Sequence, residues 1–203
     1  MVNEIRLYVE GGGDSNDTKA RMREGFDGFL QELKALARSK RIKWQIIACG
    51  PRNKAFSAFE TALETHPDAF NVLLVDAEGP VHTYPWQHVQ SRDGWRVSGI
   101  DDECCHLMVQ MMAAWLIADR DALTRFYGQG FGENAIPKHS NVEQVDKSTL
   151  EPALKAATRN TSKGEYHKIR HGCKLLAQLD SARVRQAAPH CERLFTILVE
   201  KMS

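Results

Sequence analysis

The 203-residue sequence lacks the features that mark several common classes of protein. No apolar run is long enough to span a bilayer, and acids interrupt the first ten residues, so we expect no membrane segment and no secretion signal. The five cysteines are odd in number and form no C-x-x-C pair, which argues against a disulfide framework and a zinc ribbon. We therefore expect a soluble cytoplasmic protein with reduced thiols.

Strong net charge and nucleotide-binding glycine motifs are also missing. The net charge is only +1, so any preference for nucleic acid must come from a local patch. The stretch YVEGGGDS carries Gly11 to Gly13, but no glycine follows three positions later and no G-K-[ST] follows. The dinucleotide fingerprint and the P-loop are therefore excluded. These glycines instead allow a tight turn beside Glu10.

The hydrophobic pattern of the first third of the chain predicts alternating strands and helices. An amphipathic helix is expected over 18–37, although Gly25 and Gly28 each weaken it by about 1 kcal/mol relative to alanine. A second helix is expected to begin at Asn53 as its N-cap. The strands are expected at 5–9, 43–50 and 70–76. This order predicts a mainly parallel α/β sheet flanked by helices, with function at the carboxyl ends of the strands.

The remaining sequence predicts one compact unit, with an α/β core over 1–127 and a loop and helical C-terminal extension over 128–203. Residues 80–102 are expected to form a long loop, followed by a short strand at 106–110 and a helix to Asp119. Core burial is expected for Trp115 and for the stretch 104–106, and exposure for Trp86.

Three acidic residues lie at the predicted ends of neighbouring strands. Glu10 ends the first strand, Asp76 ends the third, and Glu78 follows two residues later. A lone acid of this kind is usually a solvated turn residue. Three of them converging at one sheet edge favour a site for Mg²⁺ or Mn²⁺, which prefer carboxylate oxygens.

A local basic segment lies at 155–174 and contains the single acid Glu165. Positive charge of this density suits a phosphate backbone, although a solvated helix face is an equal alternative. His167 and His171 have zinc-like i, i+4 spacing, but their cationic neighbours favour phosphate contact or acid–base work. For His171, packing and capping stay open. The candidate phosphate or nucleic-acid ligands are Arg159, Lys163, Lys168, Arg170 and His171, with Lys163 and His167 also candidates for catalysis.

Several motifs together resemble an uncharacterised bacterial domain-of-unknown-function family. The motifs are YVEGGGDS, ACGPRNKAF, LLVDAEGP, PWQHVQSRDGW, HLMVQMMAAWLIADRDAL and KGEYHKIRH. That family is predicted to be TOPRIM-like and is often encoded beside AAA or ABC-type ATPases in phage-defence loci. TOPRIM domains hold Mg²⁺ with a glutamate after the first strand and an acidic D-x-D or D-x-E after the third. The resemblance thus implies metal roles for Glu10, Asp76 and Glu78.

The resemblance implies a Mg²⁺-dependent nuclease subunit acting on DNA or tRNA, with an ATPase as its protein partner. A homo-oligomer is compatible with the sequence. One departure concerns Ala113, which stands where a glutamate is expected in a pattern like M-E-A-W. Either activity is lost, which makes the chain a non-catalytic interaction module, or Asp119 compensates. A third, weaker interpretation is phosphoryl transfer on small substrates.

Overall fold

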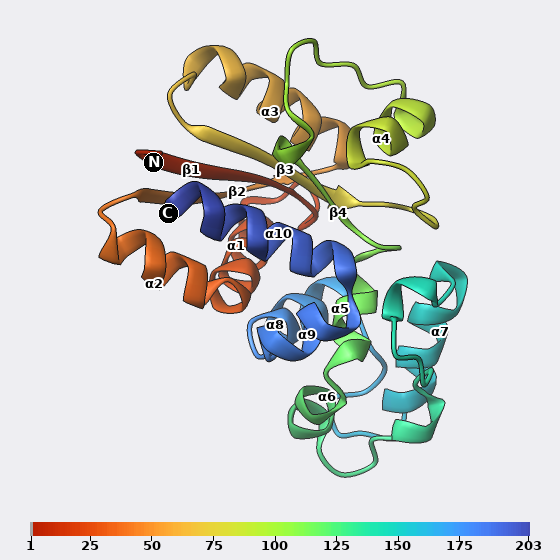
Figure 1. Ribbon diagram of the computed structural model, residues 1–203. Helices are drawn as coiled ribbons and strands as arrows, with labels where there is room; N and C mark the ends of the chain where they lie inside the picture. The colour runs from red at the N-terminus through yellow and green to blue at the C-terminus, as the bar shows by residue number, and fades with distance from the viewer. Residues whose placement is uncertain (1) are drawn as a thin grey trace.

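The computed structural model describes residues 2–203 and centres on a parallel sheet (Figure 1). The strand order is β2-β1-β3-β4, and every neighbouring pair is parallel. Its strands are β1 (Glu4–Glu10), β2 (Lys43–Gly50), β3 (Phe70–Asp76) and β4 (Cys105–Met108). The predicted α/β class, with a parallel sheet flanked by helices and a helical C-terminal part, is confirmed.

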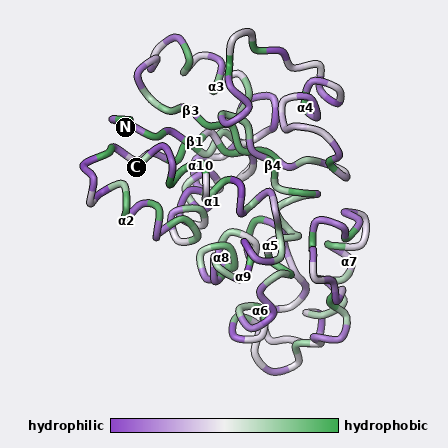
Figure 2. Tube along the Cα trace, in the orientation of Figure 1, coloured by the Kyte–Doolittle hydropathy of each residue, from purple (hydrophilic) through white to green (hydrophobic). Residues whose placement is uncertain are grey.

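Helices cover both faces of the sheet, because the side chains of its central strands alternate between two apolar layers. Leu7 and Leu74 pack in one layer, beneath α1 (Asn16–Phe29), α2 (Gln31–Ser39) and α10 (Pro189–Met202). Tyr8 and Leu73 pack in the other, beneath α3 (Arg52–Thr65) and α4 (Pro85–Asp93). Hydrophobic stretches accordingly mark the strands in Figure 2. Packing on both faces thereby holds the central strands β1 and β3, and so the residues at their carboxyl ends, in place.

The predicted helix over 18–37 is two helices. Helix α1 ends at Phe29 and α2 begins at Gln31, with Leu30 between them at φ −96° and ψ 19°. Leu30 is fully buried, so this change of direction keeps the apolar side chains of both helices on the sheet. Gly25 has a packing role, because a Cβ there would lie 2.7 Å from the carbonyl oxygen of Cys173.

Two other local predictions were wrong. Helix α3 begins at Arg52, and its N-cap is Pro51, whose carbonyl accepts the amide hydrogens of Lys54 and Ala55. Asn53 therefore lies inside the helix. The predicted loop over 80–102 contains α4, which begins at Pro85 and ends before Gly94 in the left-handed conformation. Proline at the start and glycine after the end are ordinary helix boundaries.

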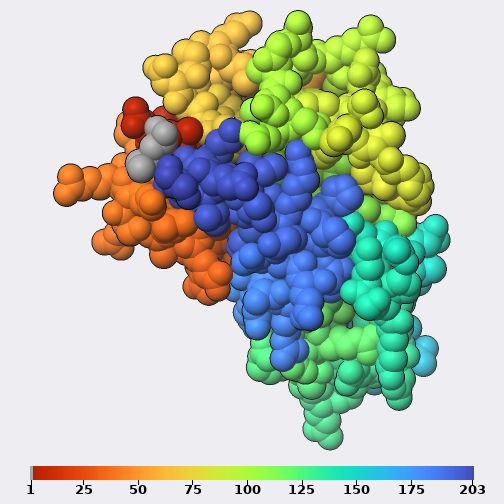
Figure 3. Space-filling view, viewed as in Figure 1, coloured from red at the N-terminus to blue at the C-terminus, as the bar shows by residue number. Residues whose placement is uncertain are grey.

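The C-terminal part is helical, as predicted, and packs on the sheet domain. Its loop over 128–145 contains two short 3₁₀ turns, and a π-helical segment, Lys168–Gly172, precedes α8. The remaining helices are α5 (Met112–Ala118), α6 (Arg120–Tyr127), α7 (Lys147–Thr158), α8 (Cys173–Leu176) and α9 (Ser181–Ala187). Helix α10 packs against β4 and α2. Figure 3 shows its outer surface, in dark blue, beside α2 in orange. The helices described within 2–203 lack the combination of length and apolar composition that spanning a bilayer requires.

Candidate metal centre

Three carboxylates meet at the carboxyl edge of the sheet. Glu10 is the last residue of β1, Asp76 is the last residue of the adjacent β3, and Glu78 follows two residues on. One oxygen from each lies within 4.8 Å of the others. The amide of Asp76 donates a 3.1 Å hydrogen bond to Glu10 Oε2, which ties the first two acids together. The structure thus brings together the three residues that the sequence singles out.

Glu10 is held by an arginine that sequence reasoning missed. Arg52 Nη1 lies 3.1 Å from Glu10 Oε2 and also donates to the carbonyl oxygen of Asp76. Its Nε and Nη2 donate to Asp93 at 3.0 and 2.7 Å, and its guanidinium lies over the ring of Trp95. Bidentate hydrogen bonding and aromatic stacking together fix the orientation of the Arg52 guanidinium. Its position just after the second strand, at the same edge of the sheet as Glu10, was the feature of the sequence that could have indicated this role.

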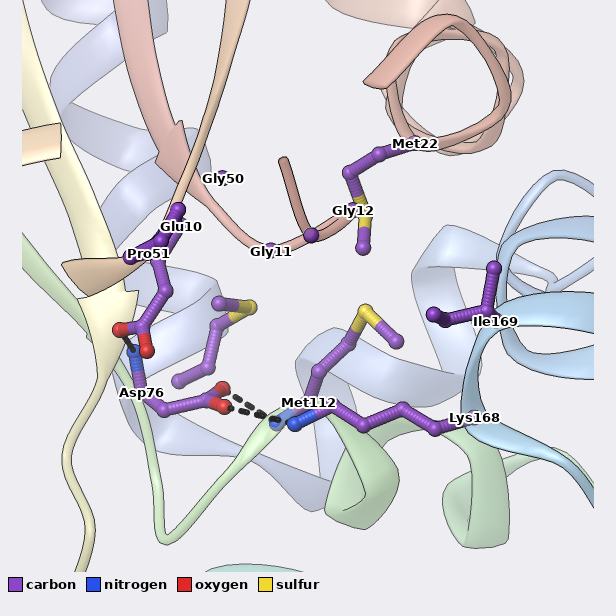
Figure 4. A pocket seen from close by; sticks show the side chains of 12 residues that line it. Glu10, Gly11, Gly12, Met22, Gly50, Pro51, Asp76, Met112, Lys168 and Ile169 are labelled. Atoms are coloured by element: carbon purple, nitrogen blue, oxygen red, sulfur yellow. Dashed lines mark hydrogen bonds and ion pairs between the residues drawn. The ribbon is translucent and has the colours of Figure 1, made fainter. Parts of the chain in front are cut away.

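Asp76 is the buried member of the cluster, with an exposed fraction of 3%. Its Oδ1 accepts a 2.7 Å hydrogen bond from the amide of Met112, the first residue of α5, and Oδ2 lies 3.7 Å from Lys168 Nζ (Figure 4). Burial raises the pKa of Asp76, and the positive charge of Lys168 only partly opposes this. A buried carboxylate of this kind is stabilised by a cation.

Glu78 adopts an uncommon backbone conformation at the same edge. Its φ is +65°, in the left-handed region, and its amide donates a 2.7 Å hydrogen bond to the carbonyl of Gln110. Its carboxylate pairs with Lys147 at the start of α7, a second cation that sequence reasoning missed. Burial alone would raise the pKa of Glu78, but the hydrogen bond and charge of Lys147 outweigh it and lower the pKa.

The electrostatics of the cluster suit a divalent cation. Burial, together with the negative charge of Asp76, raises the pKa of Glu10 to about 7. The oxygen donors of Glu10, Asp76 and Glu78 match the preference of Mg²⁺ and Mn²⁺ for carboxylates completed by water or phosphate. The residues present therefore fit such an ion.

A pocket of about 230 Å³ opens beside Glu10 and Asp76 (Figure 4). Its far wall is apolar and includes Met22 and Met112. Its rim is formed by the three glycines after β1, all with positive φ. A Cβ at Gly11 would lie 2.6 Å from Met22 Cε, so glycine lets the backbone pass close to this side chain. The glycines shape the edge of the carboxylate pocket.

The predicted basic ligands divide into one residue at the centre and others outside it. Within 2–203, Lys168 alone of them has an ion pair with one of the three carboxylates. His167 Nδ1 accepts hydrogen bonds from the amides of Ile169 and Arg170, so it caps the π-helical segment that carries Lys168. The other predicted ligands lie away from the carboxylates. Arg159 follows the end of α7, Lys163 lies over the ring of Phe126, and Arg170 is exposed. The imidazole of His171 is hydrogen-bonded to the hydroxyl of Tyr127 at 3.0 Å.

Neither Ala113 nor Asp119 supplies a ligand. Ala113 is 2% exposed and packs in the apolar core, next to the Met112 amide that contacts Asp76. Asp119 caps α6 through the amide of Ala122 and accepts a hydrogen bond from the amide of Asp180. Among the described residues it is outside the carboxylate group, so the idea that it compensates was wrong.

The structure also tests the predicted burial or exposure of Trp115, of the stretch 104–106 and of Trp86. Trp115, Cys105 and His106 are buried, as expected, while Cys104 is half-buried. Trp86 was expected to be exposed, but it is half-buried against Phe59 and its indole donates to the carbonyl of Asp101. Trp86 is a packing residue of α4. The prediction of exposure failed because the sequence pattern did not indicate this helix.

Comparison with known proteins adds a family to this geometry. No curated protein and no solved structure matches the chain at a significant level. The profile of the family described as "Domain of unknown function (DUF4276)" matches residues 9–199, which include all three carboxylates and the helices around them. The chain therefore belongs to the DUF4276 family.

Proposed function

We propose that this protein is a Mg²⁺- or Mn²⁺-dependent, TOPRIM-type nuclease that hydrolyses phosphodiester bonds in DNA or RNA. The observation that carries the proposal is the convergence of Glu10, Asp76 and Glu78 within 4.8 Å, with Glu10 and Asp76 lining a pocket. Glu10 and Asp76 have raised pKa values, and Asp76 is buried, so an added cation would relieve their mutual repulsion. Many metal-dependent phosphatases and nucleases use carboxylate-bound metal centres of this kind.

Each residue has a distinct part in this proposal. Glu10, Asp76 and Glu78 would hold the metal, which when bound supplies a water of lowered pKa and a Lewis acid for the phosphoryl oxygen. Arg52 orients Glu10 and fixes the end of β3. Lys168 lies on the pocket side of Asp76, where its ammonium would face the scissile phosphate. His167 is a positioning residue for Lys168.

The local charge balance makes nucleic-acid binding depend on the metal. The carboxylates of Glu10, Asp76, Glu78 and Asp93 are each paired with cationic partners, which are Arg52, Arg92, Lys147 and Lys168. Four positive groups thus face four acids. A divalent cation would give this region a positive charge that attracts a phosphate backbone. Arg159, Lys163, Arg170 and His171 would contact that backbone away from the centre.

We further propose that an AAA or ABC-type ATPase delivers the substrate or licenses cleavage in an anti-phage system. The support is the family resemblance and the chain's net charge of +1, which gives it little general attraction for nucleic acid. A partner with its own nucleic-acid surface would supply that attraction.

A second candidate is a non-catalytic interaction module of an ATPase complex. It is favoured by Ala113, and by the lysines that already neutralise Glu78 and Asp76 without a metal. In that case the acids would serve only to hold α7 and the π-helical segment on the sheet.

A cleavage assay separates the two candidates. The purified chain, alone and with its genomically adjacent protein, is incubated with plasmid DNA, single-stranded DNA and total tRNA in Mg²⁺ or Mn²⁺. We expect cleavage that disappears in Asp76→Asn and in Glu10→Gln, with circular dichroism showing that both variants remain folded. Cleavage that persists in both variants would rule out the proposed centre, and its absence from the wild type in every mixture would favour the interaction module.

A further inference from the structure

A second pocket lies on the other side of Glu78. It has a volume of about 280 Å³ and is lined by the loop after β3 and by one side of α4. Glu10 and Asp76 line the first pocket and Glu78 lines this one, so the carboxylates form the boundary between the two. A chain-like ligand that occupied both pockets would cross the three acids.

The second pocket presents hydrogen-bond donors suited to phosphate or sugar oxygens. Its lining includes the side chains of His82, Thr83, Ser91 and Arg92. Arg92 pairs with Asp93, a carboxylate that Arg52 also binds in bidentate fashion while pairing with Glu10. The carboxylate of Glu78 is paired with Lys147. With the acids neutralised in this way, the pocket can accept an anionic group once a divalent cation occupies the centre.

An exposed aromatic residue follows Thr83, one of the residues that line this pocket. Tyr84 is 70% exposed, the highest value among the large hydrophobic residues described. It directly follows Thr83 and precedes Pro85, the first residue of α4, and its carbonyl oxygen accepts a 3.0 Å hydrogen bond from the amide of His88. The backbone of Tyr84 is thus fixed while its ring faces solvent. Aromatic rings in this situation serve as stacking platforms for nucleobases.

A third pocket adjoins the second one. It has a volume of about 480 Å³ and shares Pro80 and His82 with the second pocket. Its lining adds the polar side chains of Asn141 and Gln144. Amide side chains donate and accept hydrogen bonds, as base edges require. The polar surface beside Glu78 therefore continues from the second pocket into this third pocket.

We propose that the pocket beside Glu78, together with Tyr84, binds an unpaired strand of nucleic acid next to the carboxylates. The inference rests on the proposed nuclease function and names its substrate class. Stacking on Tyr84 requires a base with a free face, whereas the bases of an intact duplex are stacked on one another. Arg92 and the hydroxyls of Thr83 and Ser91 would contact the backbone beside that base.

Strand binding is tested by fluorescence anisotropy with a short labelled single-stranded DNA, a single-stranded RNA and the matching DNA duplex. The assay uses the full chain in Ca²⁺, a hard cation that carboxylates bind. Tyr84→Ala should weaken single-strand binding by about tenfold, and Tyr84→Phe, which keeps the ring, should restore it. Arg92→Gln should also weaken it, whereas the matched control Arg38→Gln should not, because Arg38 is exposed on α2, on the opposite face of the sheet from α4.

The outcomes separate this inference from the proposed function. Equal affinity of wild type, Tyr84→Ala and Arg92→Gln for single strands, or tighter binding of duplex by the wild type, would overturn the inference even if cleavage is observed. Weakening by Tyr84→Ala with rescue by Tyr84→Phe would support it even if no cleavage is ever detected, since the readout is binding. The proposed function fails separately, if cleavage is absent or survives Asp76→Asn.

Discussion

Glu10 shows how burial converts an ordinary acid into a group that titrates near neutral pH. Its carboxylate lies between the Asp76 amide and Arg52, and burial together with the charge of Asp76 raises its pKa to about 7 from an ordinary value of 4.5. Between these two values the folded protein keeps a proton that the unfolded chain has lost. Stability from this group is therefore present at low pH and declines as pH rises.

The first prediction concerns that decline. In EDTA, the free energy of unfolding of the wild type should fall between pH 4.5 and 7, relative to the Glu10→Gln variant, because glutamine cannot ionise. Urea denaturation at pH 5 and pH 8 measures the difference. Because the charges of Glu10 and Asp76 interact, the substitution also changes the titration of Asp76, so the difference between the two proteins reports on the pair. Parallel pH profiles for the two proteins would mean that the environment of Glu10 does not favour its neutral form.

Lys147 competes with a metal for the Glu78 carboxylate. Because its ammonium lowers the pKa of Glu78 by pairing with it, Lys147→Gln should free an oxygen ligand and strengthen Mn²⁺ binding by roughly fivefold, the equivalent of about 1 kcal/mol for a partly exposed pair. Isothermal titration calorimetry measures the change. Lys155→Gln, at an exposed position on the same helix, is the matched control. Weaker binding by Lys147→Gln would assign Lys147 a supporting role instead.

At the scale of elements, α1 and α8 pack closely because α1 carries glycine at the contact. A Cβ at Gly25 would meet the backbone of Cys173, and one at Gly28 would lie 2.8 Å from Ala177 Cα. These residues weaken an isolated helix, yet they let the segment that follows Lys168 lie against α1. The close packing thus fixes the position of the π-helical segment beside the pocket.

Gly25→Ala tests this packing. The substitution gains about 1 kcal/mol in helix propensity but forces an overlap that costs about 1–3 kcal/mol, so we expect a net loss of stability. Thermal denaturation should show a lower Tm for Gly25→Ala than for the wild type, while Arg23→Ala, exposed on the same helix, should leave Tm nearly unchanged. A raised Tm in Gly25→Ala would show that α8 moves aside easily.

The alternation of elements explains why the acids could be predicted and the cations could not. Glu10, Asp76 and Glu78 follow strands whose apolar runs are visible in the sequence, and parallel topology brings such ends together. Arg52 and Lys147 come from helix starts at a distance in the chain, and their pairing depends on tertiary packing. The break at Leu30 and the helix α4 were missed because helix period and loop composition do not reveal changes of direction.

At the scale of the whole molecule, the C-terminal helices complete the site instead of forming a separate layer. One apolar cluster contains Ile5 in β1 and Met202 in α10, and it also contains Trp115 of α5. Lys147 and Lys168 reach the carboxylates from this part of the chain. The boundary at residue 127 stays a prediction, but truncation there would remove both lysines from the centre and the helix α8 that packs against α1.

The central claim, that the three acids form a metal centre, is tested most directly by titrating the full chain with Mn²⁺ in a calorimeter at pH 8. At that pH Glu10, with its pKa of about 7, is mostly ionised. We predict saturable binding by the wild type, accompanied by a higher Tm, and affinity at least about tenfold weaker in Asp76→Asn and Glu10→Gln. Absence of binding by the wild type, or equal affinity in all three proteins, would contradict the account.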